Sequence, residues 1–345
     1  MNSWGTLPLV PDTDGDGLLD GAEVTAGLNP IDALDAQADY DGDGLSNADE
    51  IARGTGVFQA DTDFDGLLDG DELVRGTNPL LPDTDGGGRV DGQEVNVDHT
   101  NPLDATDDLP FVSLPVVLVD GTNFMWDVSN DGSIGDGTND AFDGGLLVVV
   151  NGAQSPYHFE ATTEEGGREI VIGPDAVAGV LLSRKVFVPA DDAFARYLEV
   201  LENPGSSPTT IRVEVTTNLG SDGGTQLVAT SDGDARFSTA DNFIVTDDID
   251  AAGDPTIAHI FSDATAALQP SSVFTNAPPD DTIQFDFDVL LPPGGTAIVL
   301  HFAVQSANQT IAVARAQALV ALDGSALAGL SEAERAAIVN FTVAP

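Results

Sequence analysis

The 345-residue sequence has no cysteine and very few basic residues. Without cysteine it has no disulfide framework, no thiolate metal site and no thiol nucleophile. The 11 lysines and arginines, among which Lys185 is the one lysine, stand against 58 acidic residues, and the formal net charge is −47. This balance argues against nucleic acid and against an anionic membrane surface as partners, because both attract clustered positive charge. No apolar run is long enough for a transmembrane helix, so we expect no membrane insertion.

Aromatic residues are scarce, at 6%, and the motifs of common enzymes are absent. There is no GxSxG, HExxH, Walker or strand-linked GxGxxG pattern. The histidines stand singly, at His99, His158, His259 and His301. A carboxylate pair for glycoside cleavage cannot be picked out among so many acids. Trp126, Tyr157 and Tyr197 are candidates for a sugar platform, although lone aromatics in strands usually belong to a core. We therefore predict no catalytic residue and favour a non-enzymatic protein.

What the sequence has in abundance is acidic residues, and many of them belong to a 12-residue motif that occurs in four copies near the N-terminus. The four copies are DTDGDGLLDGAE from Asp12, DYDGDGLSNADE from Asp39, DTDFDGLLDGDE from Asp61 and DTDGGGRVDGQE from Asp83. The first three match the calcium-loop template D-x-[DN]-x-[DN]-G-x5-E at every defined position. A solvated acidic linker without any ion is the alternative, but disorder does not require glycine and glutamate at fixed offsets.

Calcium takes about six to eight oxygen ligands, which such a loop supplies from its first, third, fifth, seventh, ninth and twelfth residues. The seventh residue contributes its backbone carbonyl, and the sixth is a glycine at a sharp turn, as at Gly17, Gly44 and Gly66. The predicted ligands are Asp12, Asp14, Asp16, Leu18, Asp20 and Glu23; Asp39, Asp41, Asp43, Leu45, Asn47 and Glu50; Asp61, Asp63, Asp65, Leu67, Asp69 and Glu72; and Asp83, Asp85, Arg89, Asp91 and Glu94. In the fourth loop Gly87 replaces the fifth-position carboxylate, which predicts a weaker site or a water in the gap. We expect three to four or more calcium ions.

The loops form an array, because Asp39, Asp61 and Asp83 recur every 22 residues after a longer first unit. Proline in the Asn-Pro connectors blocks helix continuation, so one helical turn after each loop, for example Ala22–Ala26, is the most we expect. This departs from an EF-hand, which frames its loop with two helices. The DxDxDG runs and GTNP at Gly76–Pro79 resemble the bacterial form of the thrombospondin type 3 repeat. That resemblance implies a rod in which protein wraps calcium and the apolar core is minimal.

Beyond a linker at residues 106–110, the composition changes to short apolar segments at strand spacing. The predicted strands are Val116–Val119, Asn123–Val128, Leu146–Val150, Glu169–Ile172, Val180–Val188, Arg196–Leu201, Ile211–Val215, Phe243–Val245, Ile257–Phe261, Ile283–Leu291 and Ala297–Val304. Several of them alternate apolar and polar residues, which is typical of an antiparallel sheet packed on one face. Thr310–Leu322 is helical in pattern, and the capping box at Ser331–Glu334 opens a second short helix to about Phe341.

The fold class predicted is mostly β: a calcium-loop repeat rod, then an antiparallel β-sandwich with short C-terminal helices. The predicted divisions are an N-terminal extension at 1–10, repeats at 11–109, a sandwich at 110–307 and a helical segment at 308–345. The β region also resembles a module of large secreted bacterial proteins with unassigned activity, through RYLEVLENPGSSP from Arg196, NLGSDG from Asn218 and DGSIGDGTNDAFDGG from Asp131. Acids crowd the last of these stretches, which is either a further calcium site around Asp131–Asp143 or a polar hairpin loop.

Two functional hypotheses follow. The first is a calcium-binding, secreted or cell-surface structural or adhesive protein, whose acidic stalk presents a sandwich that contacts a surface protein or glycan or self-associates. The second is an extracellular protein that binds or degrades polysaccharide and uses the repeats as a spacer. The start, MNSWGTLPLVP, lacks the pattern of a signal peptide. We expect a mature form or a piece of a longer exported protein; the alternative is a cytoplasmic protein, in which low free calcium would leave weak sites empty. The acidity fits either bound divalent cations or a saline habitat, and both can hold.

Overall fold

A computed structural model describes residues 5–108, 110–220, 224–234, 236–248, 254–276 and 281–344. The chain divides into two compact units, Met1–Leu109 (unit 1) and Pro110–Pro345 (unit 2), which are described separately below. Residues 1–4 of the predicted N-terminal extension lie outside the described residues. Within the described ranges, no helix combines the length and apolar character needed to span a bilayer.

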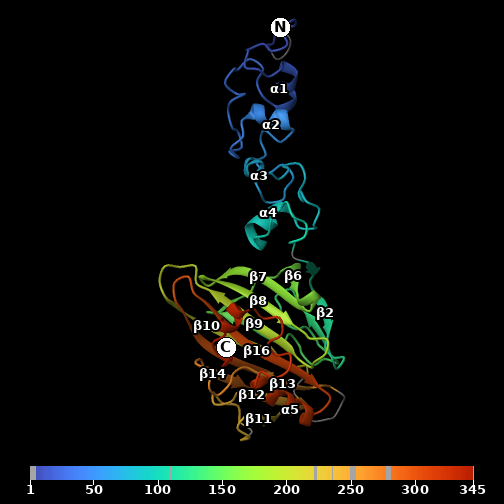
Figure 1. The fold of residues 1–345 in the computed structure, drawn as a ribbon, viewed down its shortest axis with the longest axis vertical. Coiled ribbons are helices and arrows are strands. Elements are labelled where there is room, and N and C mark those ends of the chain that lie inside the picture. The colour runs from blue at the N-terminus through green and yellow to red at the C-terminus, as the bar shows by residue number, and fades with distance from the viewer. Residues whose placement is uncertain are drawn as a thin grey trace. The chain divides into compact units, whose positions relative to one another are not determined.

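Unit 1 consists of the four acidic loops, each leading into a short helix (Figure 1). The helices are α1 (Asp20–Ala26), α2 (Asn47–Arg53), α3 (Asp69–Arg75) and α4 (Asp91–Gln93), the last continued by a π-helical turn, η1 (Glu94–Asp98). The first three have seven residues, more than the single turn predicted, because each begins at the ninth residue of its loop. They end at Gly27, Gly54 and Gly76, whose positive φ angles allow the cap amide to return to the carbonyl of the twelfth loop residue.

Unit 2 is built from antiparallel sheets, as the alternating sequence predicts (Figure 1). Among the described residues, the large sheet has the order β1 (Phe111–Ser113), β6 (Glu160–Glu164), β7 (Glu169–Val177), β8 (Val180–Phe187), β9 (Ala195–Glu202), β16 (Thr296–Ser306), β13 (Thr256–Ile260), β12 (Phe243–Asp248) and β11 (Thr225–Thr230). The small sheet has the order β14 (Ser272–Thr275), β15 (Thr282–Leu291), β10 (Thr209–Asn218), β4 (Leu147–Val150) and β5 (Ala153–Gln154). A ribbon of β2 (Val116–Val119) and β3 (Met125–Val128) and a 3-10 turn, η2 (Glu165–Gly167), complete the unit. All eleven predicted strands are confirmed.

The two sheets of unit 2 pack face to face and enclose one apolar core. The register of β10 with β15 pairs Val213 with Phe287 and Val215 with Phe285, and these four side chains are buried. The intervening pair, Glu214 and Asp286, belongs to the opposite, polar face of the same strands. Period-two alternation therefore assigns one face of the small sheet to the core.

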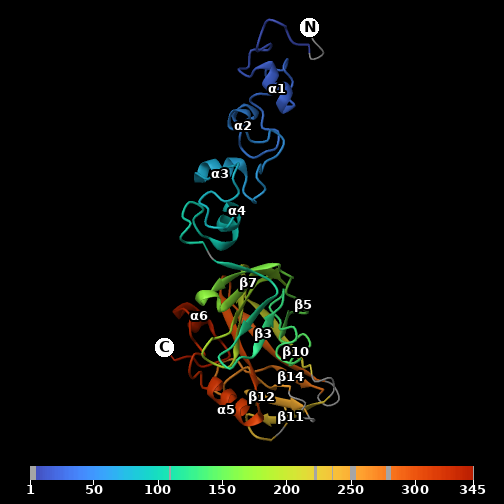
Figure 2. The same ribbon diagram turned by 90° about the vertical axis from the view of Figure 1, so that its right-hand side faces the viewer.

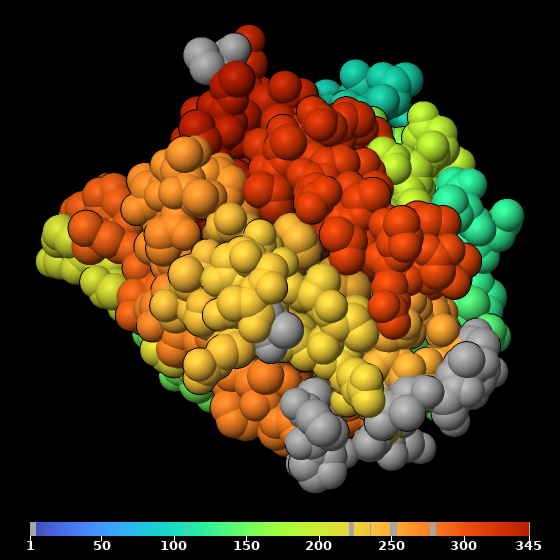
Figure 3. All heavy atoms as spheres, turned by 90° about the horizontal axis from the view of Figure 1, so that it is seen from below, coloured from blue at the N-terminus to red at the C-terminus, as the bar shows by residue number. Residues whose placement is uncertain are grey.

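The other face of the large sheet is covered by the C-terminal helices, α5 (Gln309–Val320) and α6 (Glu332–Ala337) (Figure 2). The orange-red α5 segment packs against the neighbourhood of β12 and β13, drawn in yellow to orange (Figure 3). The capping box of Ser331 and Glu334 is confirmed. The second helix is shorter than predicted, because Ile338 leaves it to form a parallel bridge with Ile298 and Phe341 is buried in the core beneath the helices. The tail thus belongs to the same compact unit as the sheets.

Candidate metal centre

Each loop of unit 1 is folded by hydrogen bonds to its own acids. In the first loop, Asp12 accepts the amides of Gly15 at 2.6 Å and Gly17 at 3.2 Å, and Asp16 accepts the amide of Leu18 at 2.9 Å. The second and third loops repeat this pattern. The sixth-position glycines have positive φ angles, from 96° to 108°, which confirms the predicted sharp turn. The loop geometry therefore follows from acids and glycines at fixed positions.

The first, third and fifth acids of a loop form one group of carboxylates. Each group brings one oxygen of every member within 4.8 Å of the others. The groups are Asp12, Asp14 and Asp16; Asp39, Asp41 and Asp43; and Asp61, Asp63 and Asp65. Close approach of three carboxylates is costly without a cation between them, because like charges at this distance repel.

The fifth acid also belongs to a second group, with the twelfth-position glutamate and an acid further along the chain. In the first loop the group is Asp16, Glu23 and Asp35, and in the third it is Asp65, Glu72 and Asp91. Sequence reasoning did not assign Asp35, which lies in the connector outside the loop template. The signal that could have found it is an extra acid in the longer first unit, just before the next loop.

The twelfth-position glutamates are the most unusual side chains of unit 1. Glu23, Glu50, Glu72 and Glu94 are all 0% exposed. Both carboxylate oxygens of Glu23 and of Glu50, and Oε2 of Glu72 and Glu94, accept no hydrogen bond within the described part of the chain. No arginine, lysine or histidine described in the structure forms an ion pair with them. A buried carboxylate without partners is unfavourable unless it binds a cation or a proton.

The electrostatics of the loops favour cation binding. Burial first, and then the charges of Asp63 and Asp65, together raise the pKa of Glu72 to about 8. The pKa values of Glu23 and Glu50 rise to about 7 for the same reasons, burial first and neighbouring carboxylates second. Hard oxygen donors that converge without a counter-charge are the donor set that calcium prefers. The loop residues therefore fit calcium, which when bound would offset the repulsion of these carboxylates.

The ninth-position residues fasten their own loops. Both carboxylate oxygens of Asp69 accept hydrogen bonds from Thr62, its amide at 2.8 Å and its hydroxyl at 2.6 Å. Asp20 and Asp91 make the same pair of bonds with Thr13 and Thr84. Asn47 instead accepts the amide of Tyr40 and donates to the carbonyl of Asp35. The ninth residues as ligands of their own loops stay a prediction, as do the seventh-position carbonyls of Leu18, Leu45, Leu67 and Arg89.

Neighbouring repeats are joined through the same acids. Gly92 donates its amide to Asp65 at 2.9 Å, and Asn96 donates to the carbonyl of Gly66 at 3.3 Å. A Cβ on Gly92 would overlap the carbonyl of Asp65, and a Cβ on Gly70 would overlap that of Asp43. The tenth loop position is therefore glycine where one loop rests directly on the preceding one.

The acidic loop around Asp131–Asp143 is held by internal hydrogen bonds. Asp127 accepts the amides of Asp136 and Gly137, at 2.9 and 2.7 Å. Asp131 accepts both the amide and the hydroxyl of Ser133. These contacts shape the loop as the acids of unit 1 shape theirs, so the further calcium site and the polar hairpin loop both stay predictions.

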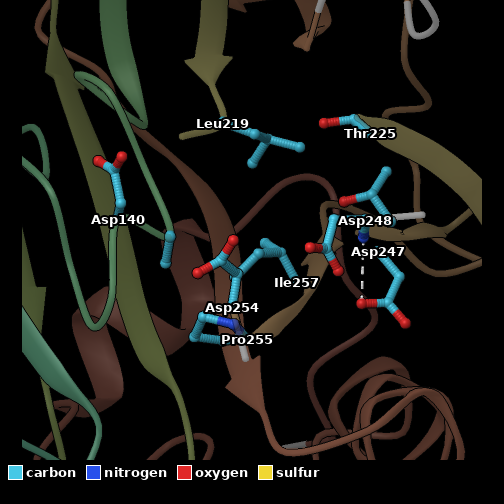
Figure 4. A pocket seen from close by; sticks show the side chains of 10 residues that line it. Asp140, Leu219, Thr225, Asp247, Asp248, Asp254, Pro255 and Ile257 are labelled. Carbon is cyan, nitrogen blue, oxygen red and sulfur yellow. Dashed lines mark hydrogen bonds between the residues drawn. The ribbon is translucent and has the colours of Figure 1, made fainter. Parts of the chain in front are cut away.

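The described part of unit 2 places most of the predicted aromatic and histidine candidates in its interior. Of the three candidate aromatics, Trp126 and Tyr197 are fully buried, and Tyr157 alone is exposed. His301 lies in β16 with Nε2 3.0 Å from Glu199, both fully buried. Figure 4 shows a small cavity lined by acids of separate loops, among them Asp140 and Asp254. Its volume of about 20 Å³ is too small for a sugar ring.

A family model of the bacterial TSP3 repeat matches residues 12–33, 39–55, 61–82 and 83–105. The repeat segment of this chain thus consists of bacterial TSP3 repeats, a calcium-binding repeat type, followed by a β-rich region. No curated protein matches the chain.

Several solved structures match part of the chain at low similarity. A TPR-domain containing protein from Parabacteroides distasonis is 11% identical over 54% of this chain and 46% of its own, with a TM-score of 0.39. A putative aldose 1-epimerase from Escherichia coli K12 is 9% identical over 57% of this chain and 100% of its own, with a TM-score of 0.37. A heparan sulfate lyase from Pedobacter heparinus is 10% identical over 60% of this chain and 38% of its own, with a TM-score of 0.36. This chain thus spans less than half of the first and third proteins, and likenesses at these scores say nothing of its function.

Proposed function

We propose that unit 1 is a calcium-loaded structural stalk of a secreted or cell-surface protein, and that the sandwich of unit 2 carries its contacts. The observation behind this proposal is the set of four buried glutamates with unpartnered oxygens. Among the described residues of unit 1, the buried hydrophobic side chains are only Leu28, Ala36, Val57 and Leu67. So small an apolar core provides little stabilisation, and bound ions would take its place.

The proposed extracellular location rests on the calcium affinity that is usual for extracellular modules and on the absence of cysteine from this chain. Extracellular calcium modules have dissociation constants of about 0.1–1 mM, which extracellular calcium saturates and cytosolic calcium does not. In a chain without cysteine, repeated metal sites can supply the cross-links that disulfides supply in other exported proteins. The partner proposed for unit 2 is a protein or glycan at the cell surface, or a second copy of this chain.

Calcium titration of the whole chain tests the stalk. After chelation, the protein should take up several calcium ions by isothermal titration calorimetry, and amide exchange should slow in residues 12–105 while unit 2 stays unchanged. Absence of binding heat at millimolar calcium would overturn the proposal.

Sedimentation of the calcium-loaded chain tests self-association. Binding to a glycan array would instead support the polysaccharide alternative, for which Tyr157 is the one exposed aromatic candidate.

A further inference from the structure

The fourth loop lacks the fifth-position carboxylate, since Gly87 stands where the other loops have aspartate. In those three loops the fifth acid accepts the amide of the seventh residue: Asp16 from Leu18 at 2.9 Å, Asp43 from Leu45 at 2.7 Å and Asp65 from Leu67 at 2.7 Å. In the first and third loops the fifth acid also joins the two carboxylate groups of its loop. Its loss in the fourth loop would remove a structural bond as well as a ligand.

The structure places another carboxylate in that position. Asp108 lies 21 residues beyond Gly87, and its Oδ2 accepts the amide of Arg89, the seventh loop residue, at 3.2 Å. A Cβ built on Gly87 would overlap the carboxylate of Asp108. Asp108 thus fills the volume of the missing side chain and makes the same hydrogen bond to the loop.

The carboxylates around Asp108 have free oxygens. Oδ1 of Asp108, Oδ2 of Asp85 and Oε2 of Glu94 are buried and accept no hydrogen bond within the described part of the chain. The Glu94 side chain is 0% exposed, so its oxygen cannot be satisfied by bulk water. Asp108 and Asp85 both lie close enough to Glu94 to act on its carboxylate, Asp108 most strongly. The three acids therefore combine proximity with unsatisfied oxygens, which a divalent cation would satisfy.

We propose that Asp108 is the fifth-position ligand of the fourth loop, so that this loop binds a divalent cation, calcium, as a complete site. The inference rests on the proposed function of unit 1. The family match of the last repeat ends at residue 105, before Asp108. A consequence is that the bound ion would hold residues 104–108 against the fourth loop, so the last segment of the repeat array would be ordered by calcium.

Transfer of the carboxylate between the two positions tests the proposal. Asp108→Ala should weaken calcium binding at the fourth loop by about tenfold or more and speed amide exchange in residues 83–108. The double variant Gly87→Asp with Asp108→Ala should restore both, because Gly87 does not have the positive φ angle that strains other residues. Once Asp108 is truncated, the remaining tight contact of the new Cβ is the Cα of Ala105 at 3.0 Å, which a shift of a few tenths of an ångström in the connector relieves. Asp71→Asn removes one charge from an exposed position of α3 and serves as the control.

The measurements are calorimetric titration of each whole chain with calcium alone, metal content after dialysis, and amide exchange. Wild-type binding in Asp108→Ala, or a double variant no better than Asp108→Ala, would overturn the inference. If the wild-type chain itself bound no calcium, the proposed function would fail first, so the two failures are distinguishable.

Discussion

The two units both bury acidic side chains, but they neutralise them differently. In unit 2, Glu199 lies 3.0 Å from Arg184 and from His301, and Glu169 lies 2.8 Å from Arg196. In unit 1, the buried glutamates have no basic partner among the described residues, and only three of the 11 basic residues belong to that unit. Unit 2 thus carries its own counter-charges, whereas under the proposed function unit 1 takes its counter-charges from cations in its surroundings.

Removal of calcium should give the largest difference in stability between the two units. With excess chelator, unit 1 should lose its slow amide exchange and become sensitive to protease throughout residues 12–105, because the carboxylates then repel one another. Unit 2 should keep its exchange pattern. Equal protection of unit 1 with and without calcium would contradict the comparison.

Truncation of a side chain in the apolar core of unit 2 should have the opposite effect, because it should destabilise unit 2 and leave unit 1 unchanged. Phe285 is 1% exposed and stacks on Phe261 with 4.9 Å between ring centroids. Phe285→Ala should therefore destabilise unit 2 by about 3–5 kcal/mol. Calorimetry should show the same loss with calcium and with chelator. A calcium-dependent loss would mean that the units do not stabilise themselves independently.

Loss of two ligands in one loop should spread along the array. Asp61→Ala with Asp63→Ala should lower local stability in calcium by about 1–3 kcal/mol in the third repeat, and by less in its neighbours. The contact of Asp65 with Gly92 provides the route to the fourth repeat. Amide exchange of α2, α3 and α4 measures the effect, and a change confined to α3 would exclude coupling between repeats.

Acid should weaken unit 2 through its buried histidines. Burial first, and then the proximity of His301, together lower the pKa of His259 to about 3. The folded pKa is below the unfolded value, so this stability is complete above about pH 6.5 and is lost as the pH falls toward 3. His259 should contribute at most about 1.4 kcal/mol per pH unit, measured by denaturant unfolding of unit 2. His259→Phe should reduce the slope, and an unchanged slope would show that other groups cause it.

The parts of the fold that sequence predicted best were those with a regular burial pattern. All eleven predicted strands are present, while β1, β5, β11 and β14 were not predicted, and these are the four edge strands of the two sheets. An edge strand has one neighbour and less burial, so its sequence alternates less clearly; β14, for example, has no fully buried residue. The polar β6, EATTE, was missed for a similar reason.

The candidate site shows a comparable limit. Spacing within the 12-residue loops identified the acids that the loops bring together, because those contacts are local. Asp35 joins a carboxylate group from a connector, and Asp108 reaches Gly87 from another connector. Both positions depend on how the chain returns after each helix. The cross-repeat position of Asp91 depends in the same way on the 22-residue spacing.

The glycines at the tenth loop position have a consequence for how such arrays evolve. Gly70 and Gly92 belong to loops that begin 22 residues after the preceding loop, and a Cβ at either position would overlap a carbonyl of that loop. Ala48 belongs to the loop that begins 27 residues after the first, and its amide donates to the carbonyl of Ala36 in the connector. Among the three loops that follow another loop, a methyl group is thus accommodated at the tenth position only after the long connector. A repeat that is duplicated or moved within the array therefore has to keep the connector that precedes its loop, because the connector length decides whether the tenth position can hold a side chain. The segment that is inherited together is a connector plus the following loop, not the loop motif alone.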